Sequence, residues 1–387
     1  GGFLVMWMAA GFAMLESGLV TSKSVATIAA KNIGLYSIAG LMFWLVGYNL
    51  AYGIPEGGFI GSFLPWSDAS AVDTGYSDGS DWFFQMVFCA TTCSIVSGTL
   101  AERIKIWPFF LFCAILAGVI YPIEMGWQWG GGHLAAAGFS DFAGSTLVHS
   151  AGAAAALAGA LLLGPRLGRF TDSGEAAPMA PFASSSIPLA TLGVFILWMG
   201  WFGFNGGSQL AMGSFDDINQ IGAIYVNTNL AAAAGVMTCA GVTRLLRGKT
   251  DVVMMLNGAL GGLVAITAEP LAPSPALAIL IGAAGGAIVI IGTEILNSLK
   301  IDDVVGAIPV HMFAGIFGTI VVPLSNSDAT FSIQLLGTFS IVVFVFVVSF
   351  IVWKIMSMTM GIRLSDEAQK EGTDIVETGV IAYSIRD

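Results

Sequence analysis

Long apolar stretches divide this chain, and the basic residues lie in alternate gaps between them. A helix that crosses a bilayer needs roughly 20 consecutive, mostly apolar residues. We count eleven such stretches, at about 2–22, 26–53, 82–101, 106–125, 142–163, 187–209, 219–246, 252–271, 274–296, 304–324 and 331–358. The pattern predicts an all-α membrane protein with eleven transmembrane helices.

The basic residues predict how these spans are oriented. All fourteen Lys and Arg lie in the odd-numbered gaps, at the start of the second span, or at the end of the last span and in the tail. The even-numbered gaps contain acids but no Lys or Arg. Because basic loops stay in the cytoplasm, we expect the N-terminus outside and the C-terminus inside. With one span more or fewer, the basic residues would no longer fall on one side of the membrane, so the alternation supports a count of eleven.

Composition excludes a soluble enzyme and most other function classes. Hydrophobic residues make up 56% of the chain and charged residues 10%, and fifty glycines suit close helix packing in lipid. All four cysteines lie within predicted spans and have no metal-ligand neighbours. We find no nucleophile triad and no nucleotide motif. We therefore expect a non-enzyme in the cell membrane, with no cofactor, no metal and no nucleic-acid partner.

One motif occurs twice, and it predicts an inverted repeat. Residues 141–149 read DFAGSTLVH and residues 303–311 read DVVGAIPVH. Asp141 begins its span from the outer side, whereas Asp303 begins its span from the inner side. Oppositely oriented repeats are typical of transporters. We therefore expect five spans per half plus one extra helix.

The same spacing places two of the three histidines deep in the membrane. Eight helical residues from the Asp to the His span about 12 Å, so His149 and His311 both approach the middle of a core roughly 30 Å thick. A histidine at that depth usually faces a partner or a pathway, and the two rings could face each other. The alternative is two separate histidines, each satisfied at its own helix contact.

Five segments follow from these patterns. The loop at 164–186 is rich in Gly, Pro and Ser, which is typical of a linker. The predicted segments are 1–163 for the first half, 164–186 for a cytoplasmic linker, 187–324 for the second half, 325–358 for the extra span and 359–387 for a cytoplasmic tail.

At these motifs the chain resembles the Amt/Mep/Rh ammonium transporter family, and its Amt branch most closely. The resemblance extends over essentially the whole chain. Its signatures include AER at 101–103, WGGG at 129–132, DFAG at 141–144, GWFGFN at 200–205, VNTNL at 226–230, NGAL at 257–260 and DDVVGAIPVH at 302–311. The resemblance implies eleven helices around a narrow pore, with one pore in each subunit of a homotrimer.

The resemblance also implies roles for individual residues. The twin histidines of the family match His149 and His311, and its outer recruitment site matches Trp129 and Ser208 with Phe88 alongside. The phenylalanine gate matches Phe88 and Phe204. The supporting and pore-lining positions match Asp141, Trp201 and Thr267, and we expect Asp303 to cap its helix as Asp141 does.

The chemistry of ammonium fits these residue types. An aromatic face attracts a cation by about 1–2 kcal/mol when it is partly desolvated, and a serine hydroxyl can accept a proton from it. Moving the intact ion through an apolar pore is expensive. We therefore expect ammonium to lose its proton near the gate, ammonia to pass the two imidazoles, and the histidine pair to relay the proton.

Several residues have a second interpretation. Trp129 also fits an interfacial aromatic belt, and the Ser208 hydroxyl also fits a bond to its own helix backbone. Phe88 and Phe204 are two of 26 phenylalanines, and only the family match selects them. Glu16 is an ionisable residue within the first span, and we expect it to have a structural partner near the inner interface.

Two functions share these pore residues. The first is ammonium transport, and the second is the membrane domain of an ammonium sensor fused to a cytoplasmic signalling domain. In the tail, Thr378 and Val380 stand where the Amt pattern has His and Glu, and serines 184–186 replace Gly-His-Asn. These departures weaken the case for a PII-type regulator and favour a specialised member. A kinase or cyclase domain after Asp387 would favour the sensor.

Overall fold

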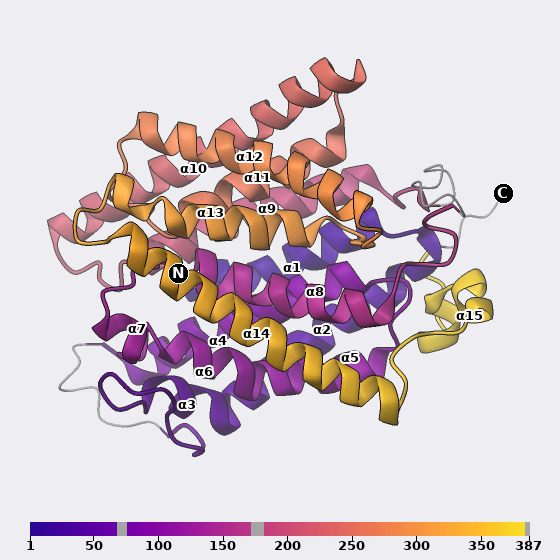
Figure 1. The fold of residues 1–387 in the computed structure, drawn as a ribbon, viewed down its shortest axis with the longest axis horizontal. Coiled ribbons are helices and arrows are strands. Elements are labelled where there is room, and N and C mark those ends of the chain that lie inside the picture. The colour runs from indigo at the N-terminus through magenta and orange to yellow at the C-terminus, as the bar shows by residue number, and fades with distance from the viewer. Residues whose placement is uncertain (68–75, 172–181, 384–387) are drawn as a thin grey trace.

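The chain folds into a bundle of long helices that run side by side (Figure 1). The computed structural model describes residues 1–67, 76–171 and 182–383. Within these ranges the structure is almost entirely helical, and the bridge between Ile104 and Arg363 is the β-type pairing it records. In Figure 1 the tail helix α15 lies at the opposite end of the bundle from α3 and α7.

Nine helical segments in the described residues are long and apolar enough to cross a membrane. They are α1 (Gly2–Leu19), η1 to α3 (Ser22–Tyr52), α4 (Asp78–Leu100), α5 to α6 (Ile106–Gly126), η5 to α8 (Ser145–Leu163), α9 (Ile187–Gly207), α10 (Phe215–Arg247), α12 (Pro275–Ser298) and α14 (Phe331–Thr359). Two shorter apolar helices are α11 (Val252–Ile266) and η7 to α13 (Ile308–Ile320). Each of the eleven predicted stretches overlaps one of these segments.

Several spans are interrupted or followed by short elements. The second span consists of η1 (Ser22–Ser24), α2 (Val25–Met42), η2 (Phe43–Gly47) and α3 (Tyr48–Tyr52), and the fourth of α5 (Ile106–Ile115), η4 (Leu116–Ile120) and α6 (Tyr121–Gly126). The two histidine segments are η5 (Ser145–Ser150) with α8 (Ala151–Leu163), and η7 (Ile308–Phe313) with α13 (Ala314–Ile320). The remaining short elements are α7 (His133–Ala136), η8 (Val322–Leu324), α15 (Asp366–Glu371) and η9 (Asp374–Thr378).

The helix α10 is longer than the predicted stretch at 219–246. Its 33 residues begin at a reciprocal cap, in which Ser214 and Asp217 bond each other's backbone N–H, and end at the left-handed Gly248. A helix of this length spans about 50 Å, so it extends beyond a hydrocarbon core of about 30 Å. The apolar pattern predicted only the part of α10 that lies in the membrane. The capping residues at its ends allow the helix to continue beyond the membrane.

Glycines allow three helices of the second half to pack closely. A Cβ atom built on Gly282 of α12 would lie 2.1 Å from the carbonyl oxygen of Ala231 in α10, and one on Gly235 of α10 would lie 2.1 Å from the carbonyl oxygen of Gly258 in α11. No larger residue fits without moving these backbones apart. Small residues at such contacts are the usual means of helix association in lipid.

Helices from the two expected halves pair with one another. The first helices of the halves, α1 and α9, pack along each other, and the histidine segments η5 and η7 are also in contact. This pairing brings residues about 160 positions apart in sequence to the same level of the bundle, which is what a site shared by two halves requires.

Ion pairs tie three loops together at one end of the bundle. Arg166 pairs with Glu102 and with Asp302, where Nε lies 2.8 Å from Oδ2. Arg103 adds a 2.6 Å bond to the Asp302 carbonyl oxygen. Burial alone would raise the pKa of Asp302, but Arg103 and Arg166 outweigh it and hold the pKa well below its usual range. Burial lowers the pKa of Arg103 to about 10.

The tail beyond α14 folds back onto the inner ends of the helices. Lys23 Nζ donates to the carbonyl oxygens of Gln369 and Lys370 at 2.7 and 2.8 Å. Asp374 accepts from the backbone N–H of Thr27 at 2.8 Å, and Glu377 accepts from that of Ile106 at 2.7 Å. The tail is therefore docked on the helix ends, despite its departures from the Amt pattern.

Candidate functional site

The first histidine segment is organised by a single carboxylate. Asp141 is fully buried and accepts backbone N–H groups from residues 144, 145, 146 and 147 at 2.8–3.0 Å. These are the donors that a helix start leaves without partners. Gly144 adopts a φ of 99°, which a side chain would disfavour. The chain then enters η5, a π-helical turn that ends with His149 and Ser150.

The second segment repeats this local structure. Asp303 accepts from the Ile308 N–H at 2.7 Å and from the Thr99 hydroxyl at 3.0 Å. Gly306 has a φ of 79°, and the chain then enters the π-helical turn η7, which contains His311. The sequence motif therefore corresponds to a conformation, namely an Asp cap, a left-handed glycine and a π-turn.

The two segments bring their histidines into direct contact. The Nδ1 atoms of His149 and His311 lie 3.2 Å apart, and the rings are stacked at 5.2 Å with an interplanar angle of 21°. Both side chains are buried, with exposed fractions of 0% and 3%. At this distance one Nδ1 carries the proton and the other accepts it. The alternative of two separately satisfied histidines is wrong, because the two rings contact each other directly.

Aromatic rings continue the column from His149. Phe204 stacks on His149 at 5.2 Å, and Phe88 stacks on Phe204 at 3.9 Å and 20°. The edge of Phe88 then meets Trp129 at 5.8 Å. Phe88 and Phe204 are essentially inaccessible to solvent. A molecule that passes between Trp129 and His149 must therefore displace this pair of phenylalanines.

Trp129 is half-buried and anchored to the first histidine segment. Its Nε1 donates to the carbonyl oxygen of Asp141 at 3.0 Å. This bond fixes the indole beside the cap of η5. A tryptophan of a lipid-facing aromatic belt would not need such a bond. Ser208 caps the end of α9, and its hydroxyl donates to the Phe204 carbonyl oxygen at 2.8 Å. The backbone bond foreseen for Ser208 is present, and its oxygen keeps lone pairs for a donor.

Trp201 and Thr267 form a second wall beside His149. The Trp201 ring stacks on His149 at 4.9 Å. Its Nε1 donates to the Thr267 hydroxyl at 2.8 Å, and that hydroxyl donates to the Leu263 carbonyl oxygen at 2.7 Å. Both side chains are fully buried. This chain of bonds fixes the indole plane against the imidazole.

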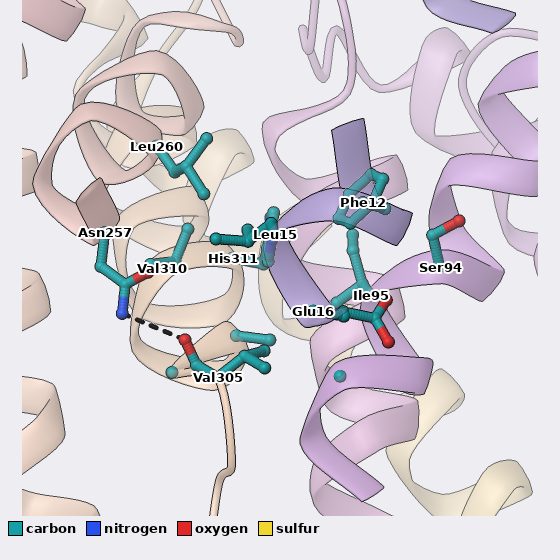
Figure 2. A pocket seen from close by; sticks show the side chains of 13 residues that line it. Phe12, Leu15, Glu16, Ser94, Ile95, Asn257, Leu260, Val305, Val310 and His311 are labelled. Atoms are coloured by element: carbon teal, nitrogen blue, oxygen red, sulfur yellow. Dashed lines mark hydrogen bonds between the residues drawn. The ribbon is translucent and has the colours of Figure 1, made fainter. Parts of the chain in front are cut away.

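A small cavity lies on the other side of the pair, next to His311 (Figure 2). Its volume of about 10 Å³ is close to what one water-sized molecule needs. The lining comes from α1, α4, α11, the segment before η7 and η7 itself, and it is mostly apolar. It consists of Phe12, Leu15, Glu16, Ser94, Ile95, Gly98, Asn257, Leu260, Val305, Gly306, Ala307, Val310 and His311.

Sequence reasoning singled out Glu16 and His311, and Glu16 does have a polar partner, the Ser97 hydroxyl. It did not foresee the cavity, Asn257 or Glu124. Asn257 donates to the Val305 carbonyl oxygen at 3.1 Å and so closes one side of the cavity. Glu124 is fully buried, and neither of its carboxylate oxygens has a hydrogen-bond partner within residues 1–67, 76–171 and 182–383. Glu16 and Glu124 can both be noticed in the sequence as acidic residues inside apolar stretches. Only the packing of the helices shows that Glu16 lines this cavity and Glu124 does not.

The fold and this column define a class of protein. A bundle of membrane-length helices that encloses a buried column of aromatic rings and two imidazoles is typical of a multi-pass membrane transporter. Residues 1–383 match the Ammonium Transporter Family. The chain belongs to the ammonium transporter family and is a membrane protein rather than an enzyme.

Individual relatives agree with this assignment. The chain is 39% identical to ammonium transporter Amt2 of Archaeoglobus fulgidus, over 99% of this chain and 86% of that protein. A solved structure titled Sensor Amt Protein superposes with a TM-score of 0.92 at 34% identity, covering 97% of this chain and 96% of that one. Mep2 of Candida albicans superposes with a TM-score of 0.84 at 26% identity, covering 95% and 85%.

Proposed function

We propose that the chain conducts ammonium nitrogen as ammonia while the two histidines pass its proton. The observation that supports this most is the continuous column from Trp129 through Phe88, Phe204 and His149 to His311. The column begins at the indole of Trp129, which can bind a cation, and ends at the pair of imidazoles, which can transfer a proton.

Recruitment takes place at Trp129, with Phe88 and Ser208. The faces of Trp129 and Phe88 attract the cation, and the Ser208 oxygen accepts one N–H. The stacked pair Phe88 and Phe204 then blocks a hydrated ion. Ammonium loses its proton at this gate, because the column beyond it is lined by aromatic rings that do not solvate a cation. His149, whose Nε2 has no hydrogen-bond partner in the described residues, takes the proton.

Passage follows the imidazoles. Ammonia is neutral and moves between the apolar walls, with the two rings as hydrogen-bond partners. The 3.2 Å contact between His149 and His311 lets a proton pass from one ring to the other. Asp141 and Asp303 support the two histidine turns, and Trp201 with Thr267 fixes the ring of His149. One charge moves with each nitrogen, so transport is electrogenic.

The assembly is part of the same proposal. By resemblance the chain works as a homotrimer with one pore per subunit, and residues 1–163 and 187–324 act as the two inverted halves. The docked tail is the surface through which a PII-type regulator or a fused signalling domain would act.

The test is a current recording. The chain is reconstituted into proteoliposomes and exposed to an ammonium pulse. We expect a saturable inward current that increases with an inside-negative potential. Saturable ammonium binding without any current would defeat the transport proposal.

A second function has a specific observation in its favour. The structure titled Sensor Amt Protein superposes with a higher TM-score than Mep2 of Candida albicans. A sensor would bind ammonium at the same outer site and pass a conformational change through the docked tail. A signalling domain encoded after Asp387, together with binding but no current, would support this function over transport.

A further inference from the structure

The cavity next to His311 contains one feature that the proposed pathway does not use, the side chain of Glu16. It comes from α1, and Figure 2 shows it at the cavity together with Phe12, Leu15 and Ile95. Its exposed fraction is 1%. A carboxylate buried at membrane depth is costly and usually functional.

One oxygen of this carboxylate is bonded and the other is free. Oε2 accepts the Ser97 hydroxyl at 2.7 Å. Oε1 is buried and accepts no hydrogen bond of ordinary geometry in the described ranges, and the Asn32 side chain is a polar neighbour of the carboxylate. A buried acceptor without a partner is destabilising, and a water or ammonia molecule in the adjacent cavity would supply the missing donor.

Lys31 of α2 does not line the cavity, but its charge interacts with that of Glu16. Its Nζ donates to the Ser97 carbonyl oxygen at 2.8 Å and lies 4.5 Å from the centre of the Phe109 ring. Among the described residues, the Cys113 thiol of α5 and the His311 imidazole of η7 are further titratable groups near Glu16. Lys31 therefore allows Glu16 to be ionised without leaving a net charge in the bundle.

The wall of the cavity beside Glu16 depends on a glycine. A Cβ atom on Gly98 would lie 2.4 Å from Val305 Cγ2 and 3.5 Å from Glu16 Cγ. Because Gly98 has no side chain, Val305 and Glu16 can both pack against α4, and all three residues line a cavity with room for a water-sized molecule. That molecule would meet His311 and Glu16 as lining groups of one cavity.

We propose that Glu16 holds the transported proton at the inner end of the pore. This inference rests on the proposed function, because it concerns the proton that the histidine pair passes on. The ionised carboxylate takes the proton from His311 through the molecule in the cavity and becomes a neutral carboxyl. Ammonia that has passed His311 takes that proton from Oε1, leaves as ammonium, and restores the carboxylate.

The test compares four variants of the full chain in proteoliposomes. Glu16→Gln keeps an oxygen for the Ser97 hydroxyl but cannot hold the proton. We expect its ammonium current to fall about 10²-fold, the lower end of what a positioned proton carrier contributes. Glu16→Asp keeps a carboxyl group at the cavity, and we expect its current to stay within about ten-fold of wild type.

Two further variants separate this role from a structural ion pair. Glu16→Gln with Lys31→Met removes both charges, so a purely structural pair predicts recovery of stability and current together. We expect recovery of stability only. Glu124→Gln is the matched control, because Glu124 is equally buried but does not line the cavity, and we expect its current to match wild type.

The possible outcomes are distinct. A wild-type current that persists in Glu16→Gln overturns the role of Glu16 and leaves the transport proposal standing. Recovery of current in the double variant assigns the pair a structural role and also overturns the inference. Absence of any wild-type current defeats the transport proposal and this inference with it.

Discussion

Replacement of Asp141 should destabilise the protein more than replacement of its counterpart Asp303. The Asp141 carboxylate accepts four backbone N–H groups, whereas Asp303 accepts one N–H and one hydroxyl. A buried donor left without a partner costs at least about 1 kcal/mol. We therefore expect Asp141→Ala to lower the free energy of unfolding by about 4 kcal/mol, and Asp303→Ala by about 2 kcal/mol.

The assay is denaturant unfolding of detergent-solubilised protein, followed by tryptophan fluorescence. Asp141→Asn is the matched control, since the amide keeps one acceptor oxygen and should lose about half of the stability that alanine loses. Equal losses for Asp141→Ala and Asp303→Ala, or a loss below about 1 kcal/mol for Asp141→Ala, would refute the assignment of Asp141 as the organiser of η5.

Three further predictions follow from single contacts. His149→Ala should lower the ammonium current by about 10²-fold and leave ammonium binding nearly intact, because the recruitment residues lie on the other side of the Phe88 and Phe204 gate; a current equal to wild type would exclude the relay. Asp302→Asn should lower the free energy of unfolding by about 3 kcal/mol at neutral pH, because it leaves the buried Arg166 with Glu102 as its remaining carboxylate partner. The pKa of Asp302 is depressed in the folded protein, so its stabilisation is present above the unfolded pKa of about 3.9 and is lost as the pH falls through the folded value. Unfolding measured from pH 7 to pH 3 should therefore show the gap between wild type and Asp302→Asn narrowing with acid. Gly282→Ala should cost about 1–3 kcal/mol, since its Cβ would meet the Ala231 backbone, whereas Gly222→Ala, which meets no atom within 4 Å, should be neutral in the same unfolding assay.

The sequence determined the membrane class, the position of each span and the repeated motif. Apolar stretches of bilayer length and basic residues in alternate gaps reflect the energetics of inserting a helix into lipid. These energetics act on each segment separately, so they can be predicted from the sequence. The spacing from Asp141 to His149 and from Asp303 to His311 likewise predicted equal depth, because helix rise is a local property. The signatures then identified the family.

Tertiary structure alone decided which side chains meet. The selection of Phe88 and Phe204 from 26 phenylalanines needed the family match, and the 3.9 Å stacking of the two rings depends on how α4 and α9 are placed by their packing against α1. The free oxygen of Glu16, the cavity next to it and the tail docked on Lys23 are also contacts between distant segments. Hydrophobic patterning predicts that a helix enters the membrane, but it does not predict which helix it packs against, because any apolar face is stable in lipid. Close packing and the hydrogen bonds of buried polar groups determine the neighbouring helices.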